Sequence, residues 1–156
     1  MIIREYQEGD KKAVEGIFAL YWTDPVFLEE LSDELESCGK DTSQKDRGFY
    51  VVEDNNTIEG IIGYKKLPDY LKPYSITDNP IELYVVASKE QRRGVGGKLK
   101  ESFLEEVRRL GFGEVLLYSP NSHSDSWGFH DTLGFERVGE VTPPKDDIGH
   151  VWRKVL

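Results

Sequence analysis

Apolar positions near the start of the chain predict a short strand, residues 2–6, followed by two helices. Eight apolar residues recur at the spacing that places side chains on one face of a helix. Asp24 followed by Pro25 is typical of a helix N-terminus, and Gly39 is typical of a helix end. The expected apolar faces consist of Val14, Ile17, Phe18 and Tyr21 in the first helix, and of Leu28, Leu31, Leu35 and Cys38 in the second.

Further along the chain the period changes to that of β-strands. Asp54-Asn55-Asn56 separates two runs rich in β-branched and aromatic residues, which predicts a hairpin. A segment with two prolines, residues 67–79, predicts a loop before the next strand. The runs expected to form strands are residues 49–52, 58–64, 81–86, 115–118, 138–141 and 151–155.

Two more helices are expected between the later strands. A long amphipathic helix ends at Gly111, and residues 122–133 predict a further helix closed by Gly134. The apolar face of the long helix consists of Leu99, Phe103, Val107 and Leu110.

This order of elements, β-α-α-β-β-β-α-β-α-β-β, predicts a mixed α/β (α+β) fold. A strand–helix–strand crossover joins parallel strands, so we expect one central parallel pair in an otherwise antiparallel sheet of six to seven strands. Helices should cover both faces of the sheet. Because the chain has 156 residues and shows no repeat or linker, we expect a single domain, residues 1–156.

Composition restricts the classes of function. The net charge of −9 argues against nonspecific binding to nucleic acid; it suits a cationic substrate, although many soluble proteins are equally acidic. No apolar run approaches the ~18 residues of a membrane span, and the chain turns polar too soon after Met1 for a signal peptide. A single cysteine, Cys38, excludes an intrachain disulfide, and the Cys and His spacing predicts no metal site. We therefore expect a cytoplasmic protein without a metal.

A glycine-rich segment, residues 91–97, connects a predicted strand to the long helix. Free N–H groups and the macrodipole at a helix start can bind a pyrophosphate, and glycine lets the phosphate approach the backbone. The simpler interpretation is a turn that only starts a helix, with solvated arginines. The spacing fits neither a Walker loop nor the G-x-G-x-x-G fingerprint, because Lys98-Leu99 follows the last glycine. The candidate phosphate-binding residues are Gln91, Arg92, Arg93, Gly94, Val95, Gly96 and Gly97.

The motif Q-x-x-G-x-G at a strand-to-helix junction resembles the pyrophosphate loop of the GNAT superfamily of acyl-CoA N-acyltransferases. Residues 83–86 lie where that family has its acetyl-CoA-binding strand, and Leu133-Gly134-Phe135 ends the next helix as the family's L-G-F does. The resemblance covers essentially the whole chain. It implies acetyl-CoA as the co-substrate, held between two splayed parallel strands. The pantetheine arm would pair with Tyr84 and Val86, with Val85 facing the opposite side.

Two residues are candidates for proton transfer. Glu82 shares a strand face with Tyr84, and its carboxylate can accept the proton of an amine; alternatively it lies at the rim, holding a cationic substrate or facing solvent. His130 occupies the position, four residues before Gly134, where the resembling family often has a tyrosine that protonates the departing thiolate. A structural histidine is the alternative. His123 stands where that family often has asparagine, which leaves one pantetheine contact unassigned.

The resemblance implies an acetyl-CoA-dependent N-acetyltransferase that acetylates a primary amine by direct attack in a ternary complex. The expected partner is a small-molecule or protein amine, with no nucleic acid and no membrane, and the sequence does not decide between a monomer and a homodimer. A non-catalytic acyl-CoA-binding sensor of the same fold is an alternative, because His130 replaces the usual tyrosine. A nucleotide-binding α/β domain is a third possibility.

Overall fold

The computed structural model describes residues 1–41, 43–90 and 94–156. Contacts divide the chain into two compact units, Met1–Tyr64 with Val85–Phe103 and Lys65–Tyr84 with Leu104–Leu156, and each is described by itself. Within the described residues the strands follow the order β1-β2-β3-β4-β5-β7-β6 in a seven-stranded sheet. The sheet is mixed, with β4 and β5 as its parallel pair. This architecture confirms the predicted fold class; the prediction of a single domain stays a prediction.

The strands of the first unit are antiparallel. β1 (Ile2–Glu5) pairs with β2 (Gly48–Asp54), which pairs with β3 (Thr57–Lys65). Asn55 and Asn56 join β2 to β3 with φ angles of 51° and 63°. Asparagine tolerates this left-handed region, and such turns match the twist of paired strands. The predicted hairpin is therefore confirmed.

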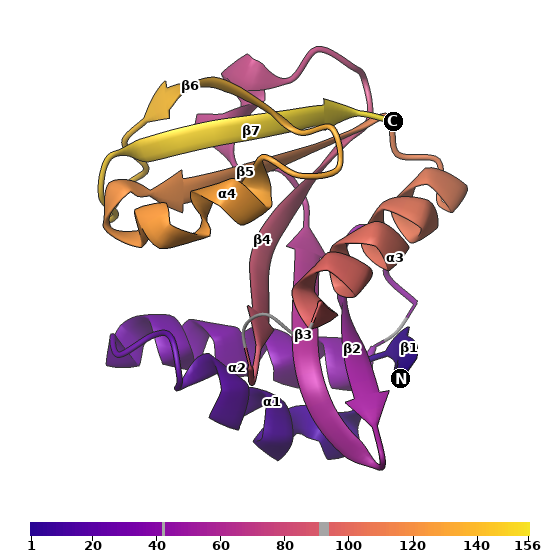
Figure 1. The fold of residues 1–156 in the computed structure, drawn as a ribbon. Coiled ribbons are helices and arrows are strands. Elements are labelled where there is room, and N and C mark those ends of the chain that lie inside the picture. Colours follow the sequence, from indigo (N-terminus) through magenta and orange to yellow (C-terminus); the bar gives the residue numbers. More distant parts are fainter. Residues whose placement is uncertain (42, 91–93) are drawn as a thin grey trace. The chain divides into compact units, whose positions relative to one another are not determined.

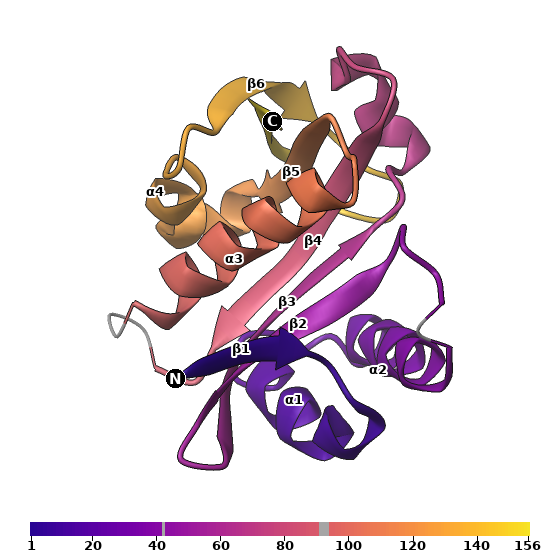
Figure 2. The ribbon, with the colours of Figure 1, turned by 90° about the vertical axis from the view of Figure 1, so that its right-hand side faces the viewer.

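Helices cover both faces of these strands. Figure 2 shows α1 (Lys11–Phe18) and α2 (Pro25–Lys40) on one face, and the N-terminal part of α3 (Val95–Arg109) on the other. The close approach of α3 depends on Gly60 of β3, where a Cβ would lie 2.7 Å from Val95 Cγ1.

The ends of α2 were predicted unequally well. Asp24 caps the helix as expected, because its carboxylate accepts a hydrogen bond from Val26 N at 3.0 Å. The predicted end at Gly39 is wrong by one residue. The helix continues to Lys40 because the N–H of Asp41 still donates to the carbonyl of Ser37.

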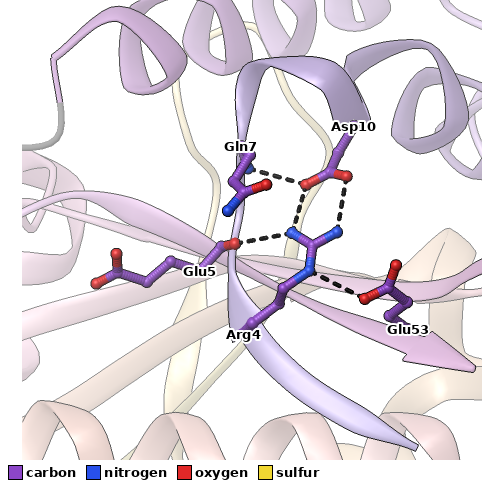
Figure 3. Close-up of polar contacts among 5 residues, drawn as sticks. All are labelled: Arg4, Glu5, Gln7, Asp10 and Glu53. Atoms are coloured by element: carbon purple, nitrogen blue, oxygen red, sulfur yellow. Dashed lines mark hydrogen bonds and ion pairs between the residues drawn. The ribbon is translucent and has the colours of Figure 1, made fainter. Parts of the chain in front are cut away.

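A charged cluster ties β1 to the turn before α1 (Figure 3). Arg4 donates from Nη1 and Nη2 to the carboxylate of Asp10 at 2.7 and 2.9 Å, and from Nε to Glu53 at 3.3 Å. Asp10 also accepts from Gln7 N at 2.9 Å. The hydrogen bond from Arg4 is the main reason why the pKa of Asp10 lies below its usual value.

The second unit contains the N-terminal part of β4 (Pro80–Ser88), the strands β5 (Glu114–Pro120), β6 (Glu136–Val141) and β7 (Gly149–Val155), and short helices. The predicted end of α3 is confirmed, because Gly111 adopts a φ of 93° and Phe112 N donates to Val107 O at 3.0 Å. Among the described residues, no helix is long and apolar enough to span a membrane.

Two predictions for the second unit need correction. Part of the expected loop 67–79 is a 3-10 helix, η2 (Asp69–Tyr74), because Leu71 is an apolar anchor that packs on β5 and β7. The expected helix 122–133 is broken into η3 (Asn121–Ser126) and α4 (Trp127–His130), followed by a turn. The six residues of η3, Asn121–Ser126, are all polar, so they supply no buried face for a longer helix.

The sheet of the second unit has two distinct faces. Leu116 of β5 and Val151 of β7 contact Leu71 of η2, and we call this side the η2 face. Trp152, next to Val151, points to the opposite side, where it contacts α4; we call this the α4 face. Figure 1 shows η2 and α4 on opposite sides of β5 and β7.

Candidate active site

The glycine-rich segment starts α3 in the first unit. Gly94 has a φ of +75°, a conformation that favours glycine, and its carbonyl accepts from Lys98 N at 3.1 Å. Apart from chain neighbours and the backbone of its own helix, a Cβ added at Gly94 or Gly97 would meet no atom of a described residue within 4 Å. This open helix start therefore has room for an anion close to the backbone. The predicted phosphate-binding residues Gln91, Arg92 and Arg93 lie outside the described residues.

The segment Val85–Ser88 of β4, which carries two of the predicted cofactor-binding residues, also lies in the first unit. Val85 is buried, and a Cβ on Gly63 of β3 would lie 2.8 Å from its Cγ1. Val86 is half-buried and points to the other side, as strand alternation requires. The alternation is confirmed, whereas pairing of Tyr84 and Val86 with pantetheine stays a prediction.

Parallel pairing of β4 with β5 is short. The register covers Pro80–Glu82 against Glu114–Leu116, although β4 continues to Ser88 and β5 to Pro120. Glu82 therefore stands at the last position of the parallel ladder. Because it pairs with Leu116, its side chain lies on the η2 face.

Glu82 is a buried carboxyl group with an unusual environment. Glu82 is only 3% exposed, and its Oε1 accepts no hydrogen bond from any described residue. Desolvation raises the pKa of Glu82 to about 7, although the nearby Lys65 cation and the hydroxyl of Tyr70 each act to lower it. The alternative in which Glu82 only faces solvent is thus wrong.

Aromatic side chains surround Glu82 on the η2 face. The ring of Tyr70 lies edge-on to that of Tyr118, with centroids 6.0 Å apart. Lys65 places its Nζ 4.4 Å from the centroid of the Tyr84 ring, on the residue that shares a strand face with Glu82. Aromatic rings and the Lys65 cation are therefore neighbours of Glu82 on this face, and Arg153, which pairs with Leu116, shares the face and donates to the carbonyl of Tyr74 at 2.9 Å.

Sequence reasoning missed Glu114, which holds the segment after η2. Its residue is completely buried, and its Oε1 accepts hydrogen bonds from Ile76 N at 3.0 Å and from Thr77 N at 2.9 Å. The hydroxyl groups of Ser75 and Thr77 donate to the same oxygen. An acidic residue directly before an apolar strand expected to be buried on both faces was the available signal.

His130 ends α4 on the α4 face. It is 7% exposed, its ring centroid lies 5.1 Å from that of Trp152, and its Nε2 lies 3.3 Å from Ser126 Oγ. The following Asp131 accepts a hydrogen bond from Trp152 Nε1 at 2.8 Å and fixes this aromatic neighbour. The proposed proton donor is therefore a buried, oriented ring, and its role stays a prediction. His123 is exposed, in a kink of η3.

Two other candidate chemistries gain no support. Cys38 is buried in α2, and desolvation raises the pKa of its thiol, which disfavours a reactive thiolate. In the described parts of the chain, no group of three or more His, Cys, Asp or Glu residues is placed to hold a metal ion.

Comparisons with known proteins identify the family of the chain. A model of the Acetyltransferase (GNAT) family matches residues 14–135. This match covers more than half of the chain. The chain therefore belongs to the GNAT acetyltransferase family, whose members use acetyl-CoA.

Individual relatives are distant in sequence. The human N-acetyltransferase 8B is 23% identical over 137 residues, which make up 86% of this chain and 56% of the relative. The chain spans about half the length of the curated relatives it matches.

Solved structures share the fold. A GNAT-family protein from Desulfovibrio desulfuricans has a TM-score of 0.83 at 14% identity, with 99% of this chain and 98% of that chain covered. The PaiA N-acetyltransferase of Thermoplasma acidophilum, solved in complex with coenzyme A, has a TM-score of 0.71 at 17% identity, with the same coverage.

Proposed function

We propose that this protein transfers the acetyl group of acetyl-CoA to a primary amine by direct attack in a ternary complex, with Glu82 as the general base. The observation that carries the proposal is the buried Glu82 carboxyl group at the end of the parallel ladder. Family membership supports the acetyl transfer.

Glu82 suits a base that works near neutral pH. A carboxyl group with a pKa of about 7 is half ionised near neutrality and is a far stronger base than an ordinary glutamate. Its carboxylate would bind the ammonium form of the acceptor and remove one proton, directly or through water. The neutral nitrogen then attacks the thioester carbonyl and releases a second proton to solvent. The carbon–sulfur bond breaks, and the departing thiolate takes up a proton, which gives the amide and the free thiol.

The start of α3 suits the pyrophosphate of the co-substrate. Acetyl-CoA supplies the activated acetyl group when it is bound. The backbone N–H groups at the first turn of α3 point out of the helix start, and Gly97 leaves the adjacent space open. Gln91, Arg92 and Arg93 are proposed to add hydrogen bonds and positive charge.

His130 is proposed as the group that protonates the thiolate. Its buried ring is held by contacts with Trp152 and Ser126, which would orient one nitrogen toward a reacting sulfur. Glu82 and His130 lie on opposite faces of the sheet of the second unit. Glu82 would take the proton of the ammonium group, and His130 would supply the proton of the departing thiol.

Glu82→Gln tests the role of the base. With a primary amine whose own pKa is near that of lysine, the wild-type rate should rise with pH through about 7 and then level off. The variant should lose roughly 10²–10⁴ of the rate at or below neutrality, and the loss should shrink toward the amine pKa, where neutral acceptor is abundant.

Two other results would lead to different conclusions. An equal loss at every pH would assign Glu82 to substrate positioning. Tight binding of acetyl-CoA with no thiol release from any amine, in the wild-type protein, would favour the non-catalytic sensor.

A further inference from the structure

Two opposite charges lie beside each other on the η2 face without forming an ion pair. Glu82 is almost fully buried, and its Oε1 has no hydrogen-bond donor among the described residues. Lys65 is half-buried over the Tyr84 ring and forms no ion pair with any residue that the structure describes. The Lys65 cation nevertheless acts electrostatically on the Glu82 carboxyl.

Buried or half-buried charges without a partner are costly, and proteins usually pair them. Lys65 and Glu82 do not satisfy each other, because they are farther apart than an ion pair allows. A ligand that carries both charges at short separation would satisfy both groups at once. Its ammonium would meet Glu82, and its carboxylate would meet Lys65.

We propose that Glu82 and Lys65 bind the two ends of a zwitterion, so that the acetyl acceptor is an α-amino acid with an apolar side chain. This inference rests on the proposed function, since the ammonium that Glu82 binds is the one that becomes acetylated. In an α-amino acid a single carbon separates the ammonium from the carboxylate. Negative and positive charges would then alternate, from the Glu82 carboxylate to the ligand ammonium, the ligand carboxylate and the Lys65 ammonium.

The neighbouring side chains favour an apolar substituent. The hydroxyl of Tyr70 acts to lower the pKa of the Glu82 carboxyl, and the Tyr70 ring meets that of Tyr118 edge to face. Leu71 anchors η2 on the same face. Other apolar or aromatic side chains of this cluster are Leu67, Tyr74, Val138 and Val141.

The charge at position 65 also disfavours the main competing acceptors. A diamine or polyamine would bring a second cation toward the Lys65 ammonium, where like charges repel. A simple amine would satisfy Glu82 and leave Lys65 without its partner. The Lys65 cation therefore distinguishes an amino acid from the amine that remains after removal of its carboxyl group.

Matched pairs of acceptors test the inference. We would measure thiol release from acetyl-CoA with L-phenylalanine against phenethylamine, and with L-leucine against 3-methylbutylamine. The wild-type protein should prefer each amino acid by roughly tenfold or more in kcat/KM, as expected for one charge-assisted contact. Lys65→Met should remove that preference, because the rates with the amino acids should fall much further than the rates with the matching amines.

Two further variants control for charge and shape. Lys65→Arg keeps the cation and should retain most of the preference for the amino acids. Lys66→Met removes the same charge one residue along, at an exposed position, and should leave the preference unchanged. Equal rates of the wild-type protein with an amino acid and its amine would overturn the inference and leave the proposed acetyl transfer intact.

A binding measurement separates the inference from the proposed function. Binding of L-phenylalanine to the protein with coenzyme A present can be measured by calorimetry, whether or not acetyl transfer occurs. Binding that Lys65→Met weakens roughly tenfold, without any acetyl transfer, would support the amino-acid site and refute the proposed function. If the protein neither binds nor acetylates L-phenylalanine and L-leucine, the amino-acid site itself is refuted.

Discussion

The carboxylate of Glu114 connects the stability of the second unit to the geometry of the candidate site. It accepts hydrogen bonds from two backbone N–H groups and two hydroxyl groups of Ser75, Ile76 and Thr77, the residues directly after η2. Desolvation by itself would raise the pKa of Glu114, but these hydrogen bonds hold it below the usual value. The charged form is therefore the stable one in the folded protein.

The cost of removing this charge follows from the number of hydrogen bonds. A hydrogen bond to a charged acceptor contributes roughly 1 kcal/mol more than one to a neutral acceptor. Glu114→Gln keeps the shape and part of the bonding, so we expect a loss of about 2 kcal/mol in the free energy of unfolding. Glu114→Ala also leaves the N–H groups of Ile76 and Thr77 without this acceptor, and the expected loss is about 4 kcal/mol.

Urea denaturation at neutral pH measures these losses, and a thermal scan should show a shift of roughly 4–8 °C for Glu114→Gln. Because the folded pKa is depressed, the stabilisation is present above the unfolded value of about 4.3 and is lost as the pH falls through the folded value. The difference between the wild-type protein and the variant should therefore stay constant above pH ~5 and narrow in acid.

Glu136→Gln is the matched control for Glu114, because Glu136 begins β6 with an exposed side chain. We expect it to change stability by less than ~0.5 kcal/mol. If Glu114→Gln is equally harmless, the hydrogen bonds to Ser75–Thr77 do not stabilise the folded state. If Glu114→Gln shows the expected loss of stability, its Michaelis constant for the acceptor should also rise, because η2 carries Tyr70. Its affinity for coenzyme A should stay unchanged.

Three further predictions address other parts of the chain. Asp10→Asn should lose about 2 kcal/mol of unfolding free energy at neutral pH and progressively less in acid, whereas Glu5→Gln, whose side chain points away in Figure 3, should be neutral in urea denaturation. Gly97→Val should weaken coenzyme A binding roughly tenfold by calorimetry without unfolding the protein, and ATP should not compete; unchanged affinity would contradict a phosphate site there. His130→Ala should lower turnover by roughly 10²–10⁴ with little change in coenzyme A affinity, and His130→Tyr should recover part of the rate; wild-type turnover of the alanine variant would remove His130 from the mechanism.

Local signals in the sequence predicted the elements whose ends depend on a single residue. Asp24 caps α2, Asn55 and Asn56 form the hairpin turn, and Gly111 ends α3, each through backbone geometry that few residue types provide. Apolar periodicity predicted the buried faces because it records directly which side chains meet the core. The order of elements then predicted the mixed sheet.

Features that depend on tertiary contacts were not predictable in this way. η2 forms because Leu71 meets β5 and β7, which are distant in sequence, whereas the two prolines of residues 67–79 suggested only a loop. The buried state of Glu82 depends on the cluster around Tyr70, so the sequence left both a base and a rim residue open. Lys65 attracted no attention, because its meaning arises only from its place over Tyr84 beside that carboxyl group.

The two faces of the second unit separate the proposed proton transfers. Glu82 lies on the η2 face, through its pairing with Leu116, whereas His130 contacts Trp152 on the α4 face. A β-sheet is one backbone thick, so neighbouring residues of a strand act on different sides. We therefore expect substitutions near Glu82, at Lys65 or Tyr70, to alter the choice of acceptor and the dependence of the rate on pH below neutrality. They should not disturb protonation of the thiolate. If Glu82 binds the acceptor as we propose, acceptor specificity should depend on η2, the segment with the weakest secondary-structure signal, because the sheet already holds the proposed base.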